Sequence, residues 1–241
     1  MQKLFIDDYS GGGKIFLNEE QSRHISKSLR MKPGDILTVC TGDGNDYGCM
    51  IDEITKDAVV LQVCYKKATE SEPDIKVSLY QGVPKGDKME DIIQKCTELG
   101  IFEITPTLTK RCVSRPQEKQ AEKKRLRYSK IALEAAQQSG RGIVPEIKKM
   151  TDFKTAVKEC DAEVKIVFYE GGGEPIHKII GTGTKSAALF IGPEGGFEKE
   201  EVEFLKENGA VCATLGKRIL RTQTAPVAAL SAIMLLTGNL E

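Results

Sequence analysis

The sequence has few of the residues and patterns that indicate a metal site, a disulfide framework or a membrane protein. Only two histidines are present, and the seven scattered cysteines form no Cys-x-x-Cys pair. An odd, scattered set is typical of reduced thiols, so we expect the cysteines to fill the core and expect no metal site. No apolar run approaches the roughly 20 residues that a membrane span requires, so we expect no membrane span.

An excess of charge of either sign is also missing. The 241 residues include 35 Lys and Arg and 35 Asp and Glu, which argues against avid, unspecific binding to nucleic acid. The balance is uneven, because residues 110–130 hold nine basic residues and two glutamates. Such a run is usually a solvated helix face, and we keep it as a candidate surface for phosphate contacts.

The N-terminus gives no sign of export. Its first eight residues, MQKLFIDD, turn acidic too soon for a signal peptide, so we expect a cytoplasmic protein. A composition of 40% hydrophobic and 29% charged residues is ordinary for a globular chain. This length allows one large domain or two unequal ones.

The pattern of predicted secondary structure changes near residue 72. Before it, the segments KIFL, DILTVCT, YGCMIDEI and AVVLQV predict short strands, and residues 19–35 predict a basic helix or turn. After it, strands alternate with helices, which predicts a mainly parallel α/β sheet. The helices are expected at 86–100, 117–139, 152–160, 198–209 and 226–237, the first ending at a left-handed Gly100. We therefore expect two domains, 1–71 and 72–241.

Three predicted strands are followed by glycine-rich loops. These are YEGGG (169–173), IGPEGG (191–196) and LGKRILRTQTAP (215–226). Ligands of parallel α/β sheets bind beyond the carboxyl ends of the strands, and glycine lets a ligand approach the backbone closely. Each loop alone could be an ordinary turn. The G-x-G-x-x-G and P-loop nucleotide fingerprints are absent, and no Ser-His-Asp order stands out.

The same loops carry a resemblance to a known family. FIGPEGGFEKEEVE (190–203) and LGKRILRTQTAPVAAL (215–230) resemble the RsmE family, ribosomal RNA small-subunit methyltransferase E, of the SPOUT class. Segments 85–113, 130–147 and 24–35 are also similar to the family pattern, so the resemblance covers most of the chain in order.

The resemblance implies a fold, a cofactor and partners. The fold would be an N-terminal PUA-like β-barrel followed by a parallel α/β domain with a deep trefoil knot. The cofactor would be S-adenosylmethionine, and the reaction would be N3-methylation of one uridine in 16S rRNA of the small ribosomal subunit. The family also implies a homodimer.

The resemblance further implies which residues form the site. Catalytic candidates are Arg221, which could stabilise charge on the uracil, and Glu194, which could accept a proton or simply pair with Arg221. The expected cofactor-binding residues are Glu170, Ile191, Gly192, Pro193, Glu194, Gly195, Gly196, Leu215, Gly216, Ile219, Leu220, Arg221 and Thr224. The expected RNA-binding residues are Arg23, Arg30, Lys32, Arg111, Arg115, Gln138 and Arg141, each of which could instead be an ordinary surface charge.

One departure from the family pattern keeps alternatives open. Gln223 stands where the family usually has Glu, so a carboxylate base would be lost, whereas a hydrogen-bonding role would survive. A second reading is a SPOUT methyltransferase that acts on tRNA or on another rRNA position. A third is a non-catalytic RNA-binding or ribosome-assembly factor.

Overall fold

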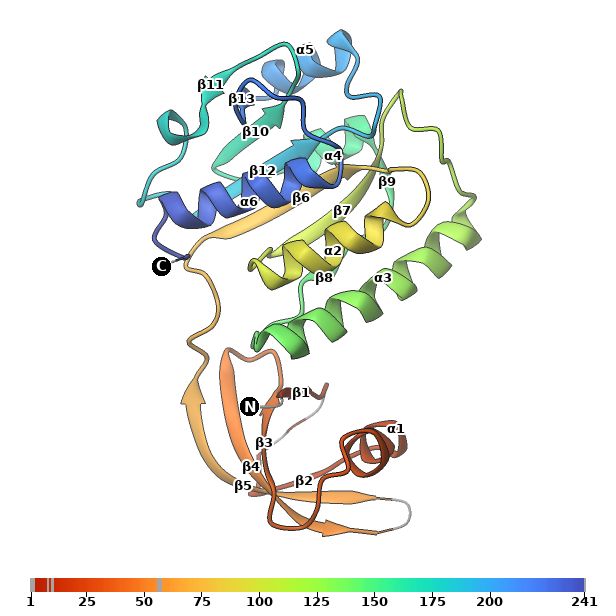
Figure 1. The fold of residues 1–241 in the computed structure, drawn as a ribbon, viewed down its shortest axis with the longest axis vertical. Coiled ribbons are helices and arrows are strands. Elements are labelled where there is room, and N and C mark those ends of the chain that lie inside the picture. The colour runs from red at the N-terminus through yellow and green to blue at the C-terminus, as the bar shows by residue number, and fades with distance from the viewer. Residues whose placement is uncertain (1–2, 8, 10, 56–57, 241) are drawn as a thin grey trace. The chain divides into compact units, whose positions relative to one another are not determined.

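The structure is a computed structural model that describes residues 3–7, 9, 11–55 and 58–240. Residues 1, 2 and 8 of the segment MQKLFIDD therefore lie outside the described residues. The chain divides into two compact units (Figure 1). The first contains Met1–Glu72 and Ala136–Val144, and the second contains Pro73–Ala135 and Pro145–Glu241.

The first unit is built on one five-stranded sheet. Its elements are β1 (Lys3–Phe5), β2 (Lys14–Phe16), α1 (Glu19–Arg23), a π-helical turn (His24–Ser28), β3 (Ile36–Cys40), β4 (Asn45–Ile54) and β5 (Val59–Ala68). The strand order is β1-β3-β4-β5-β2, with β1 parallel to β3 and the other pairs antiparallel. The expected helix or turn at 19–35 is thus a short helix, which the Asn18 side chain caps at the Gln21 amide.

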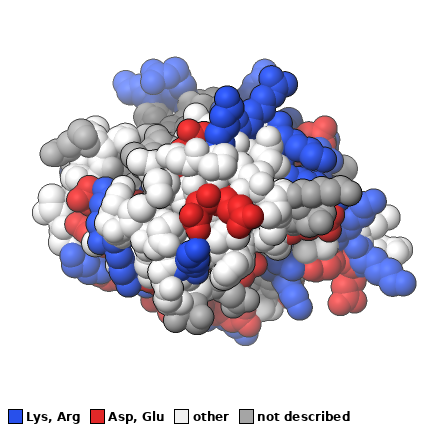
Figure 2. Space-filling model, turned by 90° about the horizontal axis from the view of Figure 1, so that it is seen from below, with Lys and Arg blue, Asp and Glu red and all other residues white. Residues whose placement is uncertain are grey.

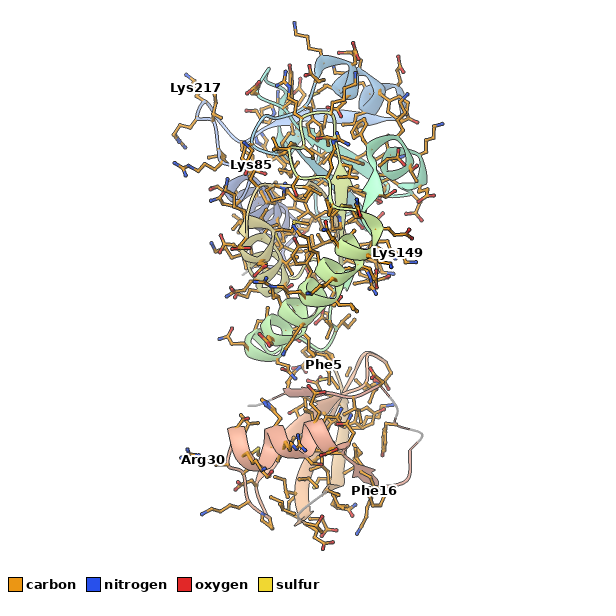
Figure 3. All side chains as sticks on the ribbon, turned by 90° about the vertical axis from the view of Figure 1, so that its right-hand side faces the viewer. Phe5, Phe16, Arg30, Lys85, Lys149 and Lys217 are labelled. Carbon is orange, nitrogen blue, oxygen red and sulfur yellow. The ribbon has the colours of Figure 1, made fainter. Side chains whose placement is uncertain are left out.

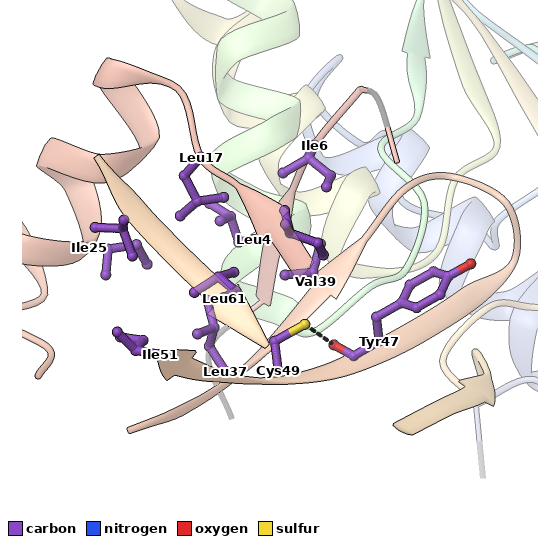
Figure 4. Close-up of a cluster of buried hydrophobic side chains, with 12 residues drawn as sticks. Leu4, Ile6, Leu17, Ile25, Leu37, Val39, Tyr47, Cys49, Ile51 and Leu61 are labelled. Atoms are coloured by element: carbon purple, nitrogen blue, oxygen red, sulfur yellow. Dashed lines mark hydrogen bonds between the residues drawn. The ribbon is translucent and has the colours of Figure 1, made fainter. Parts of the chain in front are cut away.

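The core of the first unit comes from side chains that alternate along its strands. Leu37 and Val39 of β3, Cys49 of β4 and Leu61 of β5 are all completely buried (Figure 4). Because successive side chains of a strand point to opposite faces, these residues lie on one side of the sheet. The Cys49 thiol also donates to the carbonyl oxygen of Tyr47, which satisfies it inside this core.

The second unit is built on a parallel sheet. Its strands are β6 (Lys76–Gly82), β7 (Glu103–Leu108), β8 (Glu146–Ile147), β9 (Thr151–Asp152), β10 (Val164–Phe168), β11 (Glu174–Pro175), β12 (Ser186–Ile191) and β13 (Ala210–Thr214). The order is β11-β13-β10-β12-β6-β7-β8, with β9 beside β7, and every pairing is parallel. The predicted parallel α/β sheet is therefore confirmed.

Helices cover both faces of this sheet (Figure 1). They are α2 (Lys88–Glu98), α3 (Glu118–Ser139), α4 (Phe153–Glu159), α5 (Lys199–Glu207) and α6 (Thr224–Leu236), with a 3-10 turn at Ile176–Lys178. Tyr80 and Phe190, on adjacent central strands, stack at 4.6 Å in a cluster that includes residues of α4 and α5. Gly100, just after α2, has a φ of +88°, as predicted for its terminator.

Most of the cysteines behave as expected. Five of the seven are buried, and burial raises the pKa of the Cys40 and Cys96 thiols to about 12, which keeps them protonated and inert. The expectation is wrong for Cys64, which is exposed because it lies at the outward-facing end of β5.

The surface carries both charges side by side. In Figure 2, acidic side chains lie near the middle of one face, and most of the basic side chains lie around its edge. This mixture agrees with the equal numbers of acidic and basic residues. Within the described part of the chain, no helix is long and apolar enough to cross a bilayer.

Candidate functional site

A cavity of about 780 Å³ lies beyond the carboxyl ends of β10, β12 and β13 in the second unit. The segments that follow these strands line it, at 168–172, 191–197 (except Gly195) and 213–225 (except Thr224), together with Lys88 at the start of α2. Its size is typical of sites for small molecules and cofactors. The three glycine-rich loops singled out in the sequence therefore converge on one space.

Two glycines allow backbone segments to meet beside this cavity. A Cβ on Gly82, at the end of β6, would lie 2.5 Å from Cδ and 2.6 Å from the backbone nitrogen of Pro193. A Cβ on Gly192 would lie 2.9 Å from backbone atoms of Gly196. Real Cβ atoms do not approach backbone so closely, so the loop 191–196 can fold against β6 only where side chains are absent.

A buried amide joins two of the loops. Gln81 is fully buried, and its Nε2 donates to Oγ1 of Thr222 at 3.0 Å and lies 3.4 Å from the carbonyl oxygen of Gly192. Thr222 Oγ1 in turn donates to the same Gly192 oxygen at 2.8 Å. Nε2 also donates to the carbonyl oxygen of Gly82, so turning the amide over would set its oxygen against two carbonyls. The network ties 191–196 to 215–223.

Replacing Thr222 by valine is expected to lower the free energy of unfolding by about 2 kcal/mol, because it leaves the buried Nε2 of Gln81 and the Gly192 carbonyl without the hydroxyl. Urea denaturation measures the loss. Thr222→Ser keeps the hydroxyl and is the control. Equal stability of the valine variant and the wild type would contradict the bridging role.

Glu194 is held by two groups at the edge of the cavity. Its Oε1 accepts from the backbone amide of Lys85 at 3.1 Å and pairs with Lys88 Nζ. Burial raises the pKa of this carboxyl, but the hydrogen bonds from Lys88 and from backbone amides together lower it by more. The net pKa therefore lies below its ordinary value. A carboxylate stabilised in this way is a weak proton acceptor.

Three exposed basic residues lie in one loop that lines the cavity. Arg221 lines the cavity and is exposed, as are Lys217 and Arg218 in the same loop. In the part of the chain that the structure describes, Glu194 pairs with Lys88 rather than with Arg221. Figure 3 shows Lys217 and Lys85 on the same side of the second unit, with Lys217 projecting outward. The Arg221 guanidinium is therefore available to a ligand.

Gln223 carries a buried oxygen with no hydrogen-bond partner in the described structure. The residue lines the cavity directly before α6. Its side chain does not cap that helix, since the amides of Thr224 and Ala225 both donate to the carbonyl oxygen of Arg221. An unpaired buried oxygen is costly, so a partner from the cavity would be favourable.

Most of the predicted cofactor-binding residues meet at the cavity. Its lining includes Glu170, Ile191, Gly192, Pro193, Glu194, Gly196, Leu215, Gly216, Ile219, Leu220 and Arg221. Gly195 and Thr224 are not among the lining residues, and a Cβ on Gly195 would instead face the side chain of Arg111. Lys88 and Thr222 were not named from the sequence, although the three glycine-rich loops that line the cavity were.

The predicted RNA-binding residues are dispersed, and three are engaged internally. Arg111 binds both carboxylate oxygens of Glu198, and Arg115 donates to backbone carbonyl oxygens. Arg141 is only 4% exposed and pairs with Glu72 at 2.6 Å. A phosphate contact by the buried Arg141 would require its pair with Glu72 to break, whereas Arg111 and Arg115 are exposed at the surface.

The other four predicted RNA-binding residues lie on the surface. Arg23 pairs with Glu19 one turn away, whereas Arg30, Lys32 and Gln138 are exposed. Arg30 (labelled in Figure 3) has a φ of +53°, a left-handed backbone conformation that residues other than glycine rarely adopt. Among the described residues, no group of three or more His, Cys, Asp or Glu side chains is placed to hold a metal ion.

Comparison with protein families matches both halves of the chain. A model described as an RNA methyltransferase domain matches residues 70–234, and one described as an RNA methyltransferase PUA domain matches residues 17–64. The cavity, its three loops and Lys88 all fall within the first match.

Individual relatives match over nearly the whole length. Ribosomal RNA small subunit methyltransferase E of Bacillus subtilis is 40% identical, over 97% of this chain and 96% of that protein. Its namesake from Mesomycoplasma hyopneumoniae is 32% identical, over 89% and 95%. The crystal structure of the namesake from Neisseria gonorrhoeae, bound to S-adenosyl methionine, is 28% identical, covers 98% of each chain and has a TM-score of 0.90.

Proposed function

Because this chain belongs to the ribosomal RNA small subunit methyltransferase E family, we propose that it methylates 16S rRNA in the small ribosomal subunit, with S-adenosylmethionine as donor. We further propose that the target atom is N3 of one uridine. The observation that carries the proposal is the glycine-lined cavity within the segment that matches an RNA methyltransferase domain. Such a substrate places the protein in the cytoplasm.

The residues around the cavity fit S-adenosylmethionine. Gly192 and Gly196 bring bare backbone to the space, and Gln223 contributes an oxygen that has no partner among the described residues. We propose that loops 191–196 and 215–221, with Glu170, hold the cofactor mainly through backbone groups. We also propose that these loops form the crossings of a trefoil knot, and that the sheet of the first unit closes as a barrel.

The mechanism places most of the work on positioning. Bound S-adenosylmethionine supplies an electrophilic methyl group. The pocket must hold the uracil in line with it and stabilise the negative charge left on the ring when the N3 proton departs. Arg221 is exposed at the mouth, and its planar fork can engage a carbonyl oxygen and a neighbouring acceptor together.

The route of the proton follows from the acid groups at the site. Glu194 is already paired with Lys88 and has a lowered pKa, so we propose that the proton leaves to solvent rather than to Glu194. Gln223 cannot take a proton either, since an amide is not a base at neutral pH, but it can accept a hydrogen bond. The loss of the usual Glu at this position is therefore compatible with catalysis.

We propose that the protein acts as a homodimer through α6. This helix is apolar on nearly all sides, yet Leu235 remains 60% exposed. A helix that is hydrophobic all round is normally buried, so its outer face is expected to be covered by a second copy.

Leu235→Glu is expected to convert the dimer to a monomer, because it would bury a charge in an apolar interface. Light scattering after size-exclusion chromatography would then give the mass of one chain rather than two. Leu126→Glu, at an equally exposed leucine of α3, is the control. A wild-type protein that is monomeric at working concentration would overturn the dimer.

Methyl transfer to small subunits tests the reaction itself. Subunits from cells that lack N3-methyluridine are incubated with labelled S-adenosylmethionine, digested and analysed by mass spectrometry, with naked rRNA and tRNA in parallel. Labelled N3-methyluridine in the rRNA is the expected product. Cofactor binding without transfer to any RNA would instead favour an assembly factor, and a modified nucleoside in tRNA would change the substrate.

A further inference from the structure

The nine basic residues at 110–130 divide into two groups in the structure. One group is engaged internally: Lys110 pairs with Glu200, Arg111 with Glu198, Arg125 with Glu122 and Arg127 with Glu90, while Arg115 donates to backbone carbonyl oxygens. The other group has no such partner within the described residues and consists of Lys119, Lys123, Lys124 and Lys130 of α3. The lysines of this run that lack an acidic partner within the described residues therefore all lie on one helix.

Three of these lysines form a line. Lys119, Lys123 and Lys130 are all exposed, and at 100° per residue their positions fall within about 40° of arc along α3. The line is about 16 Å long at 1.5 Å per residue. Leu126, which is 58% exposed, falls on the same line. Figure 3 shows α3 at the front of the second unit.

Positive side chains on this face of α3 lie close enough to repel one another. Lys119 and Lys123 are four residues apart, and so are Lys123 and Arg127. Like charges at this spacing destabilise a helix, and among the described residues only Arg127 of the three has an acidic partner. An anion outside the protein would relieve the repulsion, and a polyanion with charges every few ångströms matches a line of lysines better than a single small anion does.

From this arrangement we propose that Lys119, Lys123 and Lys130 form an RNA phosphate-binding ridge. This proposal rests on the proposed rRNA substrate. The ridge binds the RNA backbone at a place outside the methyl-transfer cavity. Its lysines act as point charges that set affinity without reading sequence. Arg111 and Arg115, which the sequence suggested for this role, already serve internal contacts.

The salt dependence of RNA binding tests the ridge. The triple variant Lys119→Gln, Lys123→Gln and Lys130→Gln keeps helix-forming residues while removing three charges. The slope of log affinity against log salt for unmethylated 16S rRNA is expected to fall by about 2, and affinity at 0.1 M salt by about 10- to 100-fold. Affinity for S-adenosylmethionine should be unchanged.

A second triple variant is the matched control. Lys154→Gln and Lys158→Gln remove two lysines at the same spacing on α4, and Lys185→Gln removes a third exposed charge. The control should keep the wild-type slope, and an equal fall in both variants would overturn the ridge. So would a ridge variant that binds naked rRNA normally but assembled subunits weakly, since that result indicates an acidic protein partner. Failure of the wild type to bind rRNA would reject the proposed function instead.

Discussion

Gly82→Ala is expected to abolish detectable binding of S-adenosylmethionine and to lower the free energy of unfolding by about 3 kcal/mol. The added methyl would meet the ring and backbone nitrogen of Pro193 and the carbonyl carbon of Gly192, all within 3.0 Å. Backbone cannot rotate away as a flexible side chain can, so β6 and the loop 191–196 must separate. That separation would also pull on the Gln81 amide, which bonds to Gly192 and Thr222.

Calorimetric titration with the cofactor and urea denaturation measure the two effects of Gly82→Ala. Gly183→Ala is the control, because a Cβ there meets nothing within 4 Å and its φ is not in the left-handed region. The alanine at 183 should change neither quantity. If Gly82→Ala binds the cofactor as the wild type does, the close approach of β6 to Pro193 is wrong.

Glu72→Ala is expected to lower the free energy of unfolding by about 3–5 kcal/mol, because it removes the Glu72 carboxylate from its pair with the buried Arg141 guanidinium. The Glu72 carboxylate also accepts from the backbone amides of Gly142 and Ile143, at 2.8 and 3.2 Å. Both amides would lose their acceptor. Hydrogen exchange should accelerate first at residues 136–144, the segment that this carboxylate holds.

The double variant Glu72→Leu with Arg141→Met separates charge from packing. Removing both members of a buried pair in favour of apolar residues costs less than removing one. The double variant should therefore be more stable than Glu72→Ala in urea denaturation. A Glu72→Ala protein as stable as the wild type would mean that Arg141 reaches solvent easily, and would return Arg141 to the RNA-binding candidates.

The larger elements of the second unit could be predicted from the sequence because their patterns are strong. The apolar run of β12 predicts a strand, and the helical spacing of Met89, Ile92, Ile93 and Cys96 predicts a helix. Both predictions are confirmed. The two-residue strands β8, β9 and β11 were missed, since so short a segment has no periodicity. The π-helical turn at 24–28 was missed for a similar reason.

The position of the loops could be predicted from the sequence better than the contacts of the side chains. Glycine-rich loops after strands indicate where a ligand lies, but residue type does not reveal pairing. Arg111 and Arg141 have the charge that RNA contacts need, yet each is satisfied by a glutamate distant in sequence. Gln81 was missed because nothing local distinguishes a buried bridging amide from any other glutamine within a strand.

The membership of residues 136–144 in the first unit has a consequence for synthesis on the ribosome. Glu72 and Arg141 are separated by 69 positions, so the Glu72 carboxylate has no Arg141 to pair with until the intervening chain has been synthesised. At typical elongation rates the wait is about 4 to 14 seconds. During this time the nascent N-terminal unit lacks its last segment, so its final folding step is coupled to translation of the long helix α3.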